Sequence, residues 1–117
     1  MVEWRNDIAI YLQVVDLFKK EVILGKYMPN DKILSVREYA LKLNVNPNTI
    51  VKAYDILAQE GLIEPRSTNG YFITENKEIL SKLKPSFATT YCREFLEHMK
   101  SIGYSKAEAV LMLKESE

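Results

Sequence analysis

The 117-residue sequence predicts a mainly helical fold with one small β-hairpin. Three observations predict it: apolar residues recur at helical spacing in several segments, small polar residues stand where helices need caps, and an Asn-Gly pair separates two short strand-like runs. With 47% hydrophobic residues the chain can bury one modest core, which excludes a multidomain enzyme.

The first helix is predicted over residues 11–24. Gly25 follows it, at the position where a helix commonly ends in the left-handed region. A turn is expected next, because Pro29 lacks a backbone donor and Asn30 tolerates a positive φ, and a short extended segment follows at Ile33. The apolar residues of this helix recur at spacings typical of one helix face: Tyr11, Val14, Val15, Phe18 and Val22.

The second and third helices are marked by their caps. Ser35 and Glu38 form a capping pair, which predicts a helix over residues 36–43. Asn46 is an N-cap candidate and Pro47 suits the first helical position, so a third helix is predicted to begin at Pro47. Its apolar stripe consists of Ile50, Ala53, Tyr54 and Leu57.

Gly61 ends the third helix, and a small hairpin is predicted after it. The strand-like runs are residues 62–64 and 71–74, and their connection contains the strong turn signal Asn69-Gly70. Three helices, the last two joined by a tight connection and followed by a two-stranded wing, predict a winged helix-turn-helix domain over residues 1–75.

Residues 76–117 are expected to form a helical tail. One helix is predicted after Pro85 and ends at Gly103, and the capping pair Ser105 and Glu108 begins a second one. Two short helices with wide apolar faces cannot cover themselves, so we expect a second copy of the chain to cover them; the alternative is that they pack back on their own winged domain. The residues expected at the dimer interface are Phe87, Tyr91, Phe95, Met99, Ile102, Val110 and Leu113.

The sequence offers little for catalysis or metal binding. Cys92 and His98 are the single cysteine and histidine, so neither a disulfide nor a structural zinc site is expected, and we predict a buried thiol and a surface histidine. Because a phosphate-binding glycine loop and a carboxylate pair spaced for acid and base roles are also missing, we predict no enzyme, no cofactor and no metal. The absence of a long apolar run predicts a soluble cytoplasmic protein without a membrane partner.

Small polar and cationic side chains gather where a winged helix-turn-helix contacts DNA. A recognition helix enters the major groove by its N-terminal end, and its backbone N–H groups there attract phosphate. The tip of a wing can reach a phosphate or the minor groove. The candidate DNA contacts are therefore Arg37, Asn46, Asn48, Thr49, Lys52, Arg66 and Gly70.

Several of these residues also have a purely structural interpretation. Asn46 is more readily explained as a helix cap, and Asn48 and Thr49 as solvated side chains. For Arg37 the alternative is a surface salt bridge with Glu38 or Glu64.

Charge sets a condition on any DNA binding. Sixteen basic residues balance sixteen acidic ones, and residues 1–75 hold nine basic and ten acidic residues, so no general basic field attracts nucleic acid. Binding would depend on local placement of charge and on two copies acting together. A twofold pairing would set two recognition helices about one DNA turn apart, on a pseudo-palindromic double-stranded operator. The competing hypothesis is a winged-helix protein-interaction module that does not bind DNA.

The order of motifs resembles the GntR family of bacterial transcription regulators, specifically its short YtrA-like subfamily. The resemblance spans nearly the whole chain. In the winged domain it rests on Ile10-Tyr11-Leu12-Gln13, residues 25–29 with Asp31, Ser35-Val36-Arg37-Glu38, Val45-Asn46-Pro47-Asn48-Thr49, Lys52-Ala53-Tyr54 and Glu60-Gly61-Leu62-Ile63. In the tail it rests on Phe95-Leu96-Glu97 and Ile102-Gly103-Tyr104-Ser105.

The resemblance implies a homodimeric repressor that controls its own operon and a neighbouring ABC transporter, and it places the family's DNA contacts on the candidate residues given above. Two positions depart from the family pattern. Leu34 stands where the family usually has proline, and Ser67-Thr68-Asn69 replaces the usual basic, glycine-containing wing tip. Because the tail is short for an enclosed pocket, a small-molecule effector is expected only at the dimer interface or between tail and wing.

Overall fold

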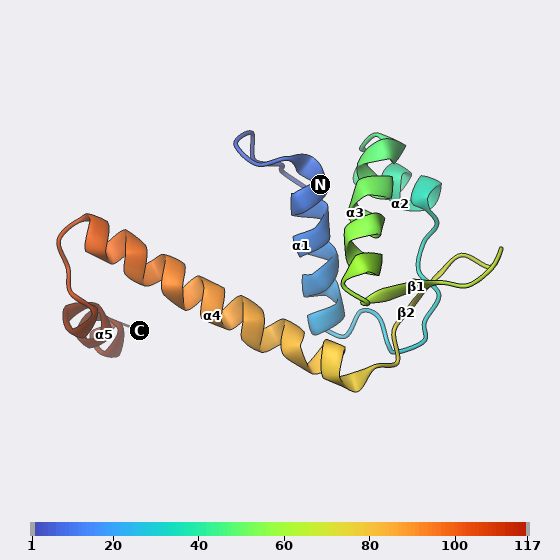
Figure 1. Cartoon of the computed structure of the whole chain (residues 1–117). Coiled ribbons are helices and arrows are strands. Elements are labelled where there is room, and N and C mark those ends of the chain that lie inside the picture. Colours follow the sequence, from blue (N-terminus) through green and yellow to red (C-terminus); the bar gives the residue numbers. More distant parts are fainter. Residues whose placement is uncertain (1, 117) are drawn as a thin grey trace. The chain divides into compact units, whose positions relative to one another are not determined.

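Five helices and one antiparallel hairpin make up residues 2–116, the part of the chain that the computed structural model describes (Figure 1). The chain divides into two units, one ending at Ser81 and the other beginning at Lys82. α4 (Lys77–Ser101) begins in the first unit and continues into the second, which also holds α5 (Lys106–Glu115). The other elements of the first unit are α1 (Ile10–Ile23), α2 (Val36–Leu43), α3 (Pro47–Gln59), β1 (Ile63–Pro65) and β2 (Tyr71–Ile73).

Three of the helices begin at the caps predicted from the sequence. At α2 the Ser35 hydroxyl accepts a hydrogen bond from the Glu38 N–H at 3.1 Å, and the Glu38 carboxylate accepts one from the Ser35 N–H at 2.9 Å. Ser105 and its partner three residues later repeat this capping box at α5. At α3 the Asn46 side chain accepts a hydrogen bond from the Asn48 N–H at 2.8 Å. These bonds satisfy N–H groups that have no partner inside the helix.

Two left-handed residues turn the chain sharply before and after α3. Asn44 follows α2 with a φ of 56°, and Gly61 follows α3 with a φ of 80°. After Gly61 the Leu62 N–H donates to the Leu57 carbonyl at 3.0 Å, the bond that defines a Schellman motif. Asparagine and glycine adopt this conformation at low cost, so the connections stay short and α2 stays close to the start of α3.

Replacing Gly61 with alanine is expected to destabilise the fold by about 1–2 kcal/mol, because an L side chain is strained in the left-handed region. A Cβ atom at this position would also lie 2.9 Å from Ile79 Cδ1. Gly25→Ala is the matched control, since its φ is 79° and no other described residue comes within 4 Å of the added Cβ. Thermal unfolding of both variants measures the two effects; a Tm of Gly61→Ala equal to that of the native chain would contradict the prediction.

Aromatic rings fix α1, α2 and α3 on one another. The Phe18 ring of α1 lies 6.2 Å from the Tyr39 ring of α2 and 6.3 Å from the Tyr54 ring of α3, measured between centroids. The Tyr39 hydroxyl donates to the Glu21 carboxylate at 3.0 Å, and the Tyr54 hydroxyl donates to the Leu34 carbonyl at 2.7 Å. Burial raises the pKa of both phenols, so both remain protonated donors. The start of α2 is thereby held in a fixed position beside α3.

The hairpin is flanked by a third extended segment. β1 and β2 are antiparallel, with Ile63 opposite Ile73. Lys32, which precedes α2, forms an antiparallel bridge with Phe72 of β2. The predicted mainly helical fold with a small hairpin is confirmed, and the wing includes this additional segment.

The tail helix begins earlier than predicted. α4 starts at Lys77, well before Pro85, and Pro85 lies inside it. The Asn76 side chain caps the helix by accepting hydrogen bonds from the N–H groups of Glu78 at 3.0 Å and Ile79 at 3.3 Å. Pro85 removes one backbone hydrogen bond, but the cap and the good helix formers before the proline keep the helix continuous.

The prediction of a buried thiol is wrong. Cys92 is exposed on α4, because no residue of this helix is buried in the single chain. His98, on the same helix, is exposed as predicted.

Candidate nucleic-acid interface

The start of α3 exposes the small polar residues that the sequence analysis selected. Asn48 is exposed and Thr49 is half-buried, whereas Ile50 is fully buried against the core. The side-chain oxygen of Asn46 accepts the cap bond, which confirms its structural role and leaves its amide nitrogen free to donate elsewhere. The first turn therefore offers amide and hydroxyl groups together with the positive end of the helix dipole.

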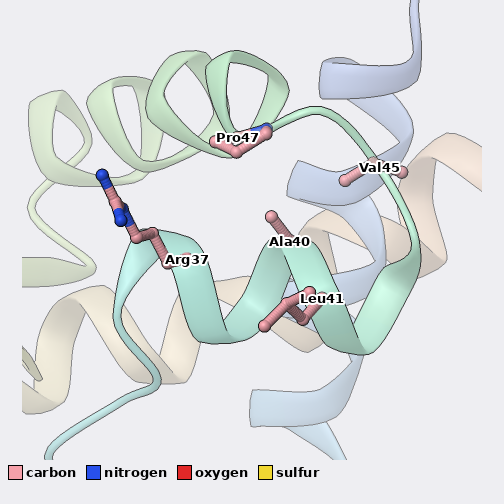
Figure 2. Close-up of a pocket in the computed structure, with 5 residues that line it drawn as sticks. All are labelled: Arg37, Ala40, Leu41, Val45 and Pro47. Carbon is pink, nitrogen blue, oxygen red and sulfur yellow. The ribbon is translucent and has the colours of Figure 1, made fainter.

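Arg37 lies exposed in the first turn of α2. Within residues 2–116 neither of the salt bridges considered for it is formed: the Glu38 carboxylate accepts from Ser35, and the Glu64 carboxylate lies 3.9 Å from Arg66 Nη2. Figure 2 shows the Arg37 side chain extending from α2 on the side that faces α3, and Arg37 and Pro47 line the same groove. A guanidinium in this position can pair with a phosphate or with the edge of a guanine.

An open groove of about 350 Å³ runs between α2 and the start of α3. Arg37 is the charged residue at its edge, and the remaining lining is apolar. The groove therefore places an apolar surface directly beside the candidate polar contacts. Its lining residues are Arg37, Ala40, Leu41, Val45 and Pro47 (Figure 2).

Lys52, one turn beyond Asn48 on α3, rests against α1. Its ammonium nitrogen lies 5.5 Å from the centre of the Tyr11 ring, a distance at which the face of the ring attracts a cation. The sequence pattern places Tyr11 only on the apolar face of the first helix. No local sequence signal pairs it with Lys52, because the contact depends on how α1 packs on α3.

The wing holds Arg66 and Gly70 together. The Arg66 N–H donates to the Gly70 carbonyl at 2.9 Å, and the Arg66 guanidinium lies 4.5 Å from the centre of the Phe72 ring. The Arg66 side chain is therefore held along the hairpin, and the exposed residues 67–69 form the tip.

A cation that the sequence analysis did not select lies beside the wing. Lys32 is exposed, and its Cε atom would lie 3.4 Å from a Cβ atom added at Gly70. The N–H and hydroxyl of Ser35 hold the pKa of the Glu38 carboxyl below its ordinary value, and the nearby charge of Lys32 acts in the same direction. Lys32 is therefore close both to the wing and to the start of α2. The one sequence signal related to the position of Lys32 beside the wing is the short extended segment predicted at Ile33.

The tail residues predicted at a dimer interface are not buried within the chain. The exposed fraction is 69% at Ile102 and 55% at Leu113. Leu111 and Met112, which also belong to α5, are exposed apolar residues as well. Of the remaining predicted residues, Tyr91 and Val110 are exposed, and Phe87, Phe95 and Met99 are half-buried.

Residues 2–116 offer neither a metal-binding cluster nor a membrane-spanning helix. No cluster of three or more histidine, cysteine, aspartate or glutamate side chains in this range could hold a metal ion. None of its helices combines the length and the apolar character needed to cross a membrane.

The three helices, the short turn between α2 and α3, and the hairpin wing define a winged helix-turn-helix protein, with polar and cationic groups at the positions where such proteins contact DNA. The chain belongs to the gntR family of bacterial regulatory proteins, whose family model matches residues 10–73.

Individual relatives support this assignment. The HTH-type transcriptional regulator YhcF of Bacillus subtilis is 34% identical over 112 residues, which cover 96% of this chain and 93% of that protein. The transcriptional repressor YtrA of B. subtilis is 40% identical over 75 residues, covering 64% of this chain and 58% of that protein. Among solved structures, a GntR family transcriptional regulator from Listeria monocytogenes has a TM-score of 0.87 and 33% identity, and the match covers 97% of this chain and 100% of that one.

The family and these relatives confirm that the chain is a DNA-binding transcription regulator. Its relatives are regulators rather than enzymes, in agreement with the small catalytic inventory of the sequence. The hypothesis of a winged protein-interaction module without DNA binding has no comparable support.

Proposed function

We propose that the chain is a homodimeric repressor that binds a pseudo-palindromic operator, with residues 1–75 contacting DNA and residues 76–117 joining the two copies. The observation that carries the proposal is the position of Arg37. Its exposed guanidinium has no ion-pair partner in residues 2–116 and lines the same groove as Pro47, the first residue of α3, so a DNA strand at this groove would bring a phosphate and a base edge within reach.

Some of the candidate residues would position the protein on the DNA backbone, and others would read the base sequence. Asn48 and Thr49 face the base edges, because a recognition helix enters the major groove by its first turn. Arg37 and Lys52 contact phosphates on either side of this turn. Asn46 holds the turn in shape through its cap bond and donates its amide to the DNA. On the wing, Arg66 contacts a phosphate and Gly70 allows close approach of the backbone.

Dimerisation would supply the DNA affinity that a single winged domain without a general basic field lacks. Exposed apolar side chains on α4 and α5 need a cover, and a second copy provides the same surface in return. Two winged domains joined in this way bind two half-sites, so the second contact benefits from a high effective concentration.

Repression of the chain's own operon and of a neighbouring ABC transporter is the regulatory role that the YtrA-like resemblance supports. A relative that matches 64% of this chain is itself named a transcriptional repressor. A dimer bound across an operator next to a promoter would block access of RNA polymerase to that promoter.

Lys32 adds a cation to the wing, in place of those absent from residues 67–69. We expect Lys32→Gln to reduce the slope of log K against log salt concentration by about 0.9, the value for one lost phosphate contact on duplex DNA. The loss of affinity should be similar on operator and scrambled DNA, since phosphates carry no sequence. Lys26→Gln, in the same connection between α1 and α2, is the matched control. An unchanged slope for Lys32→Gln would remove Lys32 from the interface.

The proposed function is tested by titrating the purified chain against the DNA upstream of its own gene at two salt concentrations, with a scrambled duplex as competitor. Binding of two chains to each site, resistant to the competitor and steeply weakened by salt, is the expected result. A folded chain that binds this DNA no better than the scrambled duplex would contradict control of its own operon. Binding of single chains would contradict the homodimer.

A further inference from the structure

The groove between α2 and α3 is lined by a large apolar side chain, Leu41, that is not packed against the core of the described chain. Leu41 is 82% exposed, although it lies on a helix whose neighbouring residues Tyr39 and Ala40 are buried. Val45 and Pro47 extend the apolar lining to the start of α3 (Figure 2). One turn beyond Pro47, Val51 is 42% exposed. Apolar surface thus continues from α2 onto the proposed recognition helix.

The surroundings of this groove indicate nucleic acid as its occupant. The Arg37 guanidinium stands at its edge and complements a phosphate, and the exposed Asn48 follows Pro47 directly. An occupant must therefore present negative charge and an apolar group within a short distance of each other. A DNA strand does so in the major groove, where the 5-methyl group of thymine is the one apolar group on the base edges.

We propose that Leu41, Val45 and Pro47 receive the 5-methyl group of a thymine in the operator, while Arg37 contacts the adjoining phosphate. This inference rests on the proposed function and assigns part of the sequence specificity to an apolar contact. The polar residues at the start of α3 then read only some of the base pairs. Leu41, which belongs to α2 rather than to the recognition helix, is a specificity-determining residue.

The test replaces each thymine of the footprinted operator, one at a time, with deoxyuridine, which lacks only the methyl group. We expect at least one replacement to weaken binding of the native chain about 3- to 5-fold, the effect of leaving one buried methyl group without its contacts. Leu41→Ala should bind the thymine and deoxyuridine operators equally at that position. Leu24→Ala also truncates a highly exposed leucine of the first unit. This variant should still bind the thymine operator more tightly than the deoxyuridine operator.

Two results would overturn the inference while leaving the regulator itself intact. One is a native chain that binds every deoxyuridine operator as tightly as the original. The other is a thymine preference that persists in Leu41→Ala, which includes an equal loss of affinity on both operators. In that case the groove would contact something other than the methyl group. Failure of the native chain to bind any operator would instead contradict the proposed function.

Discussion

A chain carrying Val110→Glu and Leu113→Glu is expected to be monomeric and to bind its operator about 100-fold or more weakly than the native chain. The two residues lie one turn apart on α5, and both are exposed in the single chain. Carboxylates placed there cannot be buried against a second copy without a large desolvation cost. Sedimentation velocity measures the mass of the particle, and a DNA titration measures the affinity.

The matched control is the double variant Leu24→Glu and Met28→Glu. These exposed apolar residues lie at the end of α1 and in the turn after it, so the variant adds the same charge outside the tail. It should remain dimeric. A dimer that persists in the α5 variant would show that α5 does not join the copies, whatever happens to the affinity.

Arg37→Ala is expected to weaken operator binding by about 1–3 kcal/mol without lowering the Tm. The guanidinium makes no hydrogen bond or ion pair within residues 2–116, so its removal takes nothing from the described fold, whereas DNA loses a charged and bidentate partner. Arg37→Lys keeps the charge but not the two parallel donors. Its affinity for the operator should lie between those of the native chain and of Arg37→Ala.

Lys42→Ala controls for the loss of a cation from the same helix, because Lys42 is exposed in the last turn of α2. Its affinity should stay close to that of the native chain. The proposed interface would be contradicted if Arg37→Ala and single substitutions of Asn48, Thr49 and Lys52 all left the affinity unchanged.

Short-range signals in the sequence predicted most of the first unit. The Ser35–Glu38 pair and Asn46 with Pro47 determine where α2 and α3 begin, because caps act on N–H groups only two or three residues away. The end of α3 depends on Gly61 in the same local way. The turn between α2 and α3, and with it the candidate site at the start of α3, could therefore be read from adjacent residues.

Features that depend on contacts between distant segments could not be predicted in this way. Lys32 reaches the wing only because its segment pairs with β2, and Lys52 reaches Tyr11 only because α1 packs on α3. The helix predicted after Pro85 begins earlier, at the Asn76 cap, because a proline inside a helix removes one backbone hydrogen bond without necessarily ending the helix. The exposure of Leu41 has no sequence signature, since its position in the helix suits either a buried or an exposed side chain.

Two of the proposed DNA cations already have aromatic partners in the free protein, Lys52 on Tyr11 and Arg66 on Phe72. A phosphate competes with the ring for each of these cations, so part of the association with DNA is an exchange of partners. Random DNA offers only phosphates for this exchange, whereas an operator adds base contacts that favour it. A chromosome presents about 10⁶–10⁹ competing sites, so weak retention on them would keep the proposed dimer free to search. The balanced charge of this chain thus favours rapid release from wrong sequences over strong hold on all of them.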